Sequence, residues 1–204
     1  MARLPPSTSK AIRQWLFRID LEDLEDAYAG AIASLAHREA EVEQMVRRQL
    51  GLDPEDEFPP CDPNDLEDPI SEIYERASDM DARTERGGHL IRKTFLIALF
   101  HLWERHRKPR IERGAELGAD RTRVLKLLDD LEAAANCAKH PPGGPAKRIY
   151  ARRPDLFPRV TEQAQVSERT LHITSEVLDE FFGAVWASLG VRREGSPLVL
   201  QMNE

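Results

Sequence analysis

The sequence predicts an all-α protein, a multi-helix up-and-down bundle with long helices. Charged residues make up 32% of the chain and aromatic residues 6%, a composition that suits a helical bundle better than a sandwich or a barrel. Apolar residues also recur three and four positions apart along most of the sequence, which is typical of amphipathic helices. The exception is Leu171–Ile173, where apolar and polar residues alternate, so we expect at most one short strand there.

Four segments follow from the pattern along the chain. Residues 1–50 are expected to form N-terminal helices, and residues 51–69, which hold five prolines and many acidic side chains, are expected to be a solvated acidic loop. Residues 70–195 are expected to be the helical bundle core, with a loose tail over residues 196–204. We expect these segments to make one compact domain overall, because 204 residues are enough to bury such a core.

The helices are placed by their apolar stripes. In the N-terminal segment one stripe begins near Ser9 and a second runs from about Asp20 to Leu50, and the pattern leaves open whether they belong to one helix. The later helices are expected over Ile70–Ala82, Gly88–Arg107, Asp120–His140 and Pro145–Arg152, with a last one capped by Thr174. The tryptophans also lie on apolar stripes, so we expect all of them in the core: Trp15, Trp103 and Trp186.

The net charge of −7 hides a strong asymmetry along the chain. Residues 1–82 carry 8 basic and 20 acidic side chains, whereas residues 83–160 carry 18 basic and 9 acidic ones. Two interpretations stay open. A basic segment can form a surface for polyanions, since contacts of Lys and Arg to phosphate dominate nucleic-acid affinity. Alternatively, the acidic and basic segments pair with each other inside one fold.

Several classes of protein are disfavoured. The longest apolar run, Thr94–Trp103, has ten residues, about half of the ~20 needed to cross a bilayer. The N-terminus lacks the apolar stretch of a secretory signal. Cys61 and Cys137 match neither a disulfide framework nor a paired zinc spacing, and the histidines near Glu104 do not share a helical face. We therefore expect a cytoplasmic protein with no membrane association, no metal and no cofactor.

The end of one predicted helix carries two side chains that are suited to acid–base chemistry. Asn136 and His140 are one turn apart on one face, and Pro141 disfavours the helical conformation at His140, which places it at the helix C-terminus. The helix dipole stabilises positive charge there. An imidazole beside a phosphate site permits metal-free acid–base work on a phosphodiester. The expected phosphate-binding cations are Lys139, Lys147, Arg148, Arg152 and Arg153. The other interpretation is that His140 only satisfies the last helix carbonyls and Asn136 packs sideways.

This stretch resembles the end of the long helix in HEPN-superfamily proteins, prokaryotic helical bundles that include toxin and antiviral ribonucleases. Their motif is an arginine, usually followed by a polar residue such as asparagine, and then a histidine five positions after the arginine. Asn136 and His140 fall on the second and last positions, whereas Ala135 occupies the place of the arginine. The resemblance covers about residues 85–190 and includes the stretches IRKTFLIALFHLWERH, AKRIYARRPDLF and LHITSEVLDEFF.

The resemblance implies a bundle that is often a symmetric dimer, with paired motifs forming one cleft. It implies an RNA-directed protein, a metal-independent endoribonuclease or its degenerate relative in defence or toxin–antitoxin biology, with His140 as acid and base and Asn136 orienting the phosphate. Ala135 cannot supply the missing cation. Either another basic residue substitutes, with Arg92, Lys139 and Arg153 as candidates, or the protein is a non-cleaving member that binds RNA or a partner such as an antitoxin.

A different class of function also fits the sequence. The chain can be a non-catalytic helical interaction module that binds a protein partner through its acidic and basic segments. A thiolate pair of Cys137 and His140 is disfavoured, because a cysteine beside alanines is typical of a small buried apolar group.

Overall fold

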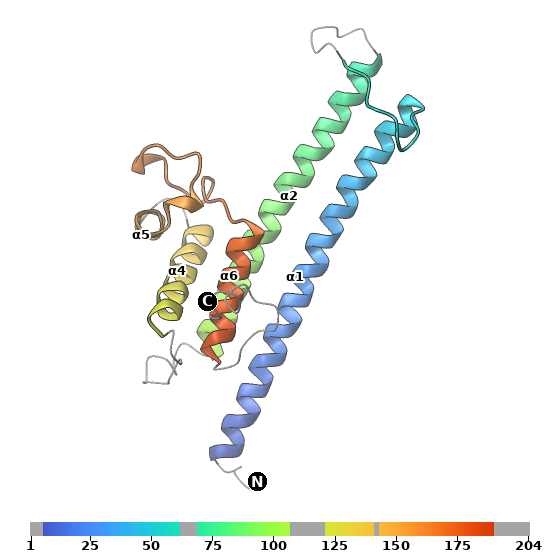
Figure 1. Ribbon diagram of the computed structural model, residues 1–204. Helices are drawn as coiled ribbons and strands as arrows, with labels where there is room; N and C mark the ends of the chain where they lie inside the picture. The colour runs from blue at the N-terminus through green and yellow to red at the C-terminus, as the bar shows by residue number, and fades with distance from the viewer. Residues whose placement is uncertain (1–5, 62–68, 107–120, 141–142, 190–204) are drawn as a thin grey trace, which may run out of the picture. The chain divides into compact units, whose positions relative to one another are not determined.

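The computed structural model describes residues 6–61, 69–106, 121–140 and 143–189. Its long helices are α1 (Pro6–Leu50), α2 (Pro69–His106) and α4 (Arg121–Lys139). The shorter elements are α5 (Gly144–Arg152), two single 3₁₀ turns at Pro154–Leu156 and Gln163–Gln165, and α6 (Ser175–Ser188). The described residues contain helices and no strand, which confirms the predicted all-α class (Figure 1).

The two longest helices are more continuous than the sequence indicated. The two stripes of the N-terminal segment belong to one helix of 45 residues, and the helices expected over Ile70–Ala82 and from Gly88 onward are one helix of 38 residues. A glycine in a helix costs about 1 kcal/mol relative to alanine. Packing outweighs that cost here, since Gly88 is buried and Gly87 lies near the Leu35 side chain.

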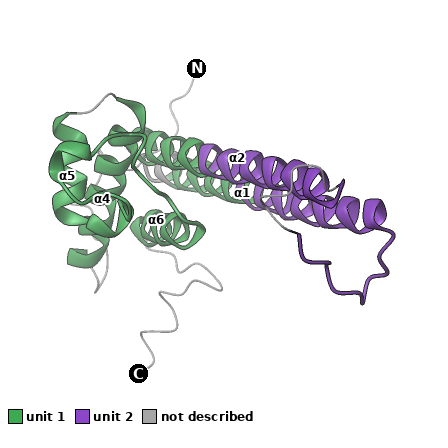
Figure 2. Ribbon diagram, turned by 90° about the horizontal axis from the view of Figure 1, so that it is seen from above, with its two compact units in different colours: residues 1–27, 92–204 green, residues 28–91 purple. Residues whose placement is uncertain are grey.

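The chain divides into two compact units (Figure 2). Unit 1 comprises residues 1–27 and 92–204, and unit 2 comprises residues 28–91. The boundary falls inside α1 and α2, where a pattern of helical stripes gives no sign of a division. The expected loose tail, residues 196–204, lies outside the described residues, as do residues 62–68 of the acidic loop.

Unit 1 has a dense core. In this unit α4 packs against both α5 and α6. The side chains that close the core are fully buried leucines and phenylalanines: Leu96, Leu99, Leu128, Leu131, Phe181 and Phe182. Apolar burial of this kind contributes roughly 1.5–3 kcal/mol for each large side chain.

The segment before α6 is extended but does not form a strand. Leu171 and Ile173 are both buried, which explains the alternation in the sequence. The backbone N–H of His172 donates to the carbonyl of Leu156 at 2.8 Å, a single contact rather than a ladder. Thr174 then caps α6 as expected, because its Oγ1 accepts a hydrogen bond from the backbone N–H of Val177 at 3.3 Å.

The tryptophans differ in how exposed their side chains are. Trp103 and Trp186 are 3% and 6% exposed, which confirms that they belong to the core. The indole Nε1 of Trp186 also donates to Glu25 Oε2 at 2.9 Å, tying α6 to α1 within unit 1. The prediction for Trp15 was wrong, since its side chain is 60% exposed on the first turns of α1.

Unit 2 is a pair of helices, the second half of α1 and the first half of α2. Its buried core is small and consists of Val42, Val46 and Ala77. The guanidinium Nη1 of Arg47 donates to the backbone carbonyls of Asp53 and Asp56, both at 3.0 Å, and so holds the chain that follows α1. The first residues of the expected acidic loop are therefore anchored to α1. No helix within the described ranges combines the length and the apolarity that crossing a bilayer requires.

Candidate functional site

Asn136 and His140 lie at the C-terminal end of α4. The backbone N–H of His140 donates to the carbonyl of Asn136 at 3.2 Å, so the two residues are joined by a helical hydrogen bond one turn apart. Asn136 is half-buried and the His140 side chain is exposed. Imidazole and carboxamide thus lie on neighbouring positions at the helix end, with the imidazole open to solvent.

Ala135, which stands where the resembled motif has its arginine, lies in the core. Ala135 is 0% exposed, and the alanines before it are buried as well. A guanidinium at this position would have to enter the packed interior, where an unpaired charge is costly. The site therefore lacks a cation at the motif's first position.

Cys137 is buried beside Ala135 and does not form a reactive pair with His140. Burial raises the pKa of its thiol from 9.0 to about 11, with Lys93 acting to lower it and Glu168 to raise it. Since the thiolate is the nucleophilic form, this cysteine is inert near neutral pH. It behaves as a small apolar core residue.

Two of the expected phosphate-binding arginines are neutralised by carboxylates. The Nε of Arg152 lies 2.9 Å from Asp130 Oδ1 and its Nη2 lies 3.7 Å from Asp129. Arg153 is bound by Asp155 at 2.9 Å and by Glu180 at 3.0 Å. The hydrogen bonds that the Arg153 guanidinium donates to Asp155 are the main reason that the pKa of Arg153 is raised.

Asp130 is the least exposed of these carboxylates, at 1%. Its contact with Arg152 lies outside hydrogen-bond geometry, so the attraction is ionic, and neither oxygen accepts a hydrogen bond from the described residues. Desolvation raises the pKa of Asp130, opposed by the nearby Arg152 and Arg153. Arg152 is consequently required to stabilise a buried charge in the fold.

Arg92 and Lys139, the other two candidates to replace the arginine of the resembled motif, also make contacts within the fold. The Nε of Arg92 donates to the backbone carbonyl of Ile173 at 2.7 Å, across 81 residues of sequence. The ammonium of Lys139 lies 4.8 Å from the centre of the Phe100 ring, a cation–π contact. Neither side chain is therefore positioned as a free phosphate ligand at the end of α4.

The sequence analysis did not identify Lys93, another cation that bonds to a backbone carbonyl within the fold. Its Nζ donates to the backbone carbonyl of Glu168 at 2.6 Å, and desolvation lowers its pKa. The available signal was a lysine immediately before the apolar run of α2. A cation in that position needs an internal partner, because a charge is rarely buried alone.

Two expected cations remain exposed. Lys147 and Arg148 lie on the outer face of α5, whose inner face is formed by the buried Ala146 and Ile149. The described residues give neither of them an ion-pair partner. Residues 141–143 alone separate the exposed His140 from α5. We call His140, Lys147 and Arg148 the α4–α5 corner.

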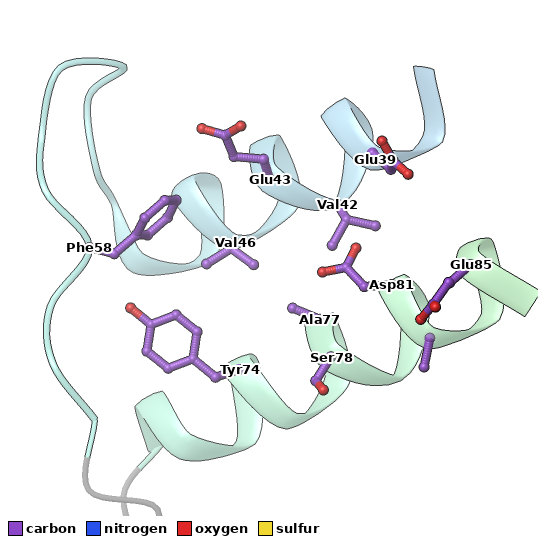
Figure 3. Close-up of a pocket in the computed structure, with 11 residues that line it drawn as sticks. Glu39, Val42, Glu43, Val46, Phe58, Tyr74, Ala77, Ser78, Asp81 and Glu85 are labelled. Carbon is purple, nitrogen blue, oxygen red and sulfur yellow. The ribbon is translucent and has the colours of Figure 1, made fainter. Parts of the chain in front are cut away.

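A second candidate site, not foreseen from the sequence, is a groove in unit 2 (Figure 3). It has a volume of about 710 Å³. Its floor is apolar and is formed by the core residues Val42, Val46 and Ala77. Phe58 and Tyr74 line one end, and the Tyr74 hydroxyl donates to the carbonyl of Pro59 at 2.8 Å.

The rim of the groove is acidic. α1 contributes Glu39 and Glu43, and α2 contributes Asp81 and Glu85, with no Lys or Arg in the lining. Each pair is one helical turn apart, so carboxylates stand along both sides of the apolar floor (Figure 3). The sequence signal was two acidic i, i+4 pairs flanking small apolar residues, but only the pairing of α1 with α2 brings them together.

Metal binding finds no support at the histidines of α2. His101 Nδ1 lies 3.8 Å from Glu104, and His106 Nε2 lies 3.4 Å from Asp20. His106 also stacks on the ring of Phe17, with ring centres 5.4 Å apart. Across the described ranges, no three potential metal-ligating side chains converge.

Comparisons with known proteins leave the family open. Neither protein-family models, nor curated proteins, nor solved structures gave a match to this chain. The functional assignment therefore depends on the geometry of the α4–α5 corner and of the unit 2 groove.

Proposed function

We propose that this chain is an RNA-directed helical protein of the HEPN-like type, and that it binds RNA through the α4–α5 corner without cleaving it. The observation that carries the proposal is that Lys147 and Arg148 are exposed without ion-pair partners among the described residues, close in sequence to the exposed His140. Exposed cations are available for phosphates, and each phosphate contact releases counterions from the nucleic acid.

The contacts of the other cations favour binding over cleavage. Ribonucleases of the resembled family use an arginine beside the asparagine, and here that position is the buried Ala135. The candidates to replace it are engaged elsewhere: Arg92 with Ile173, Lys139 with Phe100, Arg153 with Asp155 and Glu180. Without a preorganised cation, the negative charge that develops on a phosphate during cleavage is not stabilised. His140 then serves as a ligand for RNA and not as an acid or base.

The test uses the full-length protein, a fluorescently labelled single-stranded RNA and a chelator of divalent metals. We expect binding that weakens steeply as salt is raised, by about 0.7 logarithmic units of affinity per tenfold salt for each phosphate contact. We expect the RNA to remain intact. Cleavage by the wild-type protein that disappears in His140→Ala would overturn the non-cleaving assignment, and binding that is absent at low salt would overturn the RNA-directed function altogether.

The resemblance also implies a homodimer, and this is part of the proposal. If two motifs share one RNA, the protein sediments as a dimer at the concentrations where it binds RNA. A monomeric protein that still binds RNA with full affinity would separate RNA binding from the paired-motif arrangement.

A non-catalytic interaction module is the second candidate function. The observation that favours it is the acidic groove of unit 2, which has no role in the RNA-directed proposal. In that case His140→Ala changes nothing beyond stability, and a protein partner binds to unit 2.

A further inference from the structure

The apolar floor of the unit 2 groove is left uncovered by the helices that form it. Two helices bury one seam between them, and here that seam contains Val42, Val46 and Ala77. Met45, Leu50, Ile73 and Tyr74 pack against it but remain partly exposed. Helices draw most of their stability in proteins from packing an apolar face against a neighbour. A third helix lying along the groove would complete this arrangement as a three-helix bundle.

Charge decides which kind of helix fits. Residues 28–91 contain 16 acidic and 6 basic side chains, and the rim of the groove follows this excess with Glu39, Glu43, Asp81 and Glu85. Arg47, the cation next to the groove, already has its own partners. Its Nε lies 3.0 Å from Glu43, and its guanidinium lies 4.4 Å from the centre of the Phe58 ring. Arg47 therefore balances Glu43, and Glu85 lies 3.7 Å from His89 Nε2, whereas Glu39 and Asp81 have no cation partner among the described residues, so the rim keeps a net negative charge.

We propose that this groove binds a basic amphipathic helix of a partner protein. The apolar stripe of that helix covers Val42, Val46 and Ala77, and Lys or Arg residues flanking the stripe pair with the carboxylates on both sides (Figure 3). Binding a helix by its apolar face in a groove is a common mode of recognition. Charge complementarity at the rim sets the choice of partner and speeds association. The proposal does not depend on the RNA-directed function.

Other occupants fit the groove less well. A second copy of this chain that presented its own groove would bring a second row of carboxylates against the first. A small polyamine would satisfy the carboxylates but would leave most of the apolar floor in contact with water. A helix that carries both apolar and basic residues matches both parts of the lining.

The probe is a designed helical peptide of about five turns, ~18 residues at 3.6 residues per turn, with a leucine stripe flanked by lysines. Two matched peptides serve as controls: one replaces the flanking lysines with glutamates, and the other replaces the leucine stripe with serines. Fluorescence anisotropy with the full-length protein measures binding of each peptide. We expect saturable binding of the first peptide, weaker at high salt, and at least ~10-fold weaker binding of both controls.

Two protein variants locate the binding site. The groove variant carries Glu39→Lys, Glu43→Lys, Asp81→Lys and Glu85→Lys. The matched control carries Glu41→Lys, Glu72→Lys, Glu75→Lys and Asp79→Lys, which are exposed on the same helices outside the lining and change the net charge equally. We expect the groove variant to lose ~10-fold or more in affinity and the control to lose less than ~3-fold. Ser78→Trp, which fills the groove without changing its charge, is expected to weaken binding as well.

Several results would overturn the proposal. Equal loss in the two charge variants would mean that the peptide binds acidic surface in general. Full affinity in Ser78→Trp would mean that the groove is not occupied, and this variant decides the matter if the groove variant fails to fold by circular dichroism. If the serine-stripe peptide bound equally well, or if spermidine displaced the leucine-stripe peptide, the rim would bind small cations and not an amphipathic helix. A dimer of this protein that the groove variant dissociates would assign the groove to a second copy.

Discussion

In unit 1 Arg152 and Arg153 lie against carboxylates, whereas in unit 2 Glu43 of the groove rim pairs with Arg47 but Glu39 and Asp81 have no cation partner among the described residues. Arg152 and Arg153 are held by Asp129, Asp130, Asp155 and Glu180, so two of the basic side chains counted along residues 83–160 are paired within the fold. The negative excess of unit 2 survives as an acidic rim. The comparison shows that charge counted along a sequence predicts surface charge only where the fold supplies no partner.

The two units also differ in how tightly they are packed, and core truncations sharpen this difference most. Phe181→Ala in unit 1 removes a fully buried aromatic ring, for which we expect a loss of about 3–5 kcal/mol in the free energy of unfolding. Val46→Ala in unit 2 removes less apolar volume from a small core, and we expect about 1 kcal/mol. Urea unfolding measures both losses. Comparable losses at the two positions would contradict the difference in packing.

The two cysteines, one in each unit, are expected to react at different rates because their burial differs. The pKa of the Cys137 thiol is raised from 9.0 to about 11 by burial, so near pH 8 its thiolate population is ~100-fold below that of an ordinary thiol. Cys61 in unit 2 is half-buried. We expect iodoacetamide to modify Cys61 at least ~100-fold faster than Cys137 in the folded protein. Mass spectrometry of timed samples identifies the site, and equal rates in urea provide the control.

Removing Arg152 tests the neutralisation of charge in unit 1. Arg152→Ala leaves Asp130 buried without its ionic partner, and because Arg152 is itself partly exposed we expect a loss of about 2 kcal/mol at neutral pH. The pKa of Asp130 is higher in the folded protein than in the unfolded chain. Between these two pKa values the folded state holds a proton that the unfolded state has lost, so the contribution of Asp130 to stability falls as pH rises through this range. The loss in Arg152→Ala therefore shrinks in mild acid, where Asp130 is protonated.

Chemical unfolding at neutral pH and at mildly acidic pH measures that change. Arg148→Ala is the matched control, since Arg148 is exposed on the same helix and its substitution is expected to stay within ~0.5 kcal/mol. A pH-independent loss in Arg152→Ala would contradict the role assigned to Asp130.

The smallest effect is expected at the first turns of α1. Trp15→Ser changes an exposed side chain, so we expect a shift within ~0.5 kcal/mol in the free energy of unfolding. Trp186→Phe, at a buried tryptophan whose indole donates to Glu25, is expected to cost about 1 kcal/mol for the lost hydrogen bond. A large loss in Trp15→Ser would show that this tryptophan is covered in solution.

The helical class, the cap at Thr174 and the position of His140 at a helix end could be predicted because each depends on neighbours within a few residues. The continuity of α2 through Gly87–Gly88 could not, because tertiary packing there outweighs local preference. The partners of the arginines could not be predicted either, because they lie far away in the sequence. Arg153 meets Glu180 across 27 residues and Arg92 meets Ile173 across 81. The groove also requires α1 to pair with α2, and no local pattern specifies that pairing.

The central claim is that the cations left exposed at the α4–α5 corner, and not the basic segment as a whole, carry RNA binding. The direct measurement is the salt dependence of RNA affinity for Lys147→Gln/Arg148→Gln beside Arg83→Gln/Arg86→Gln, a pair of exposed arginines in unit 2. We predict that the first variant binds more weakly and that its slope against the logarithm of salt falls by about 1.4, two contacts at ~0.7 each, while the second matches wild type. Equal slopes in the wild type and both variants would contradict the account.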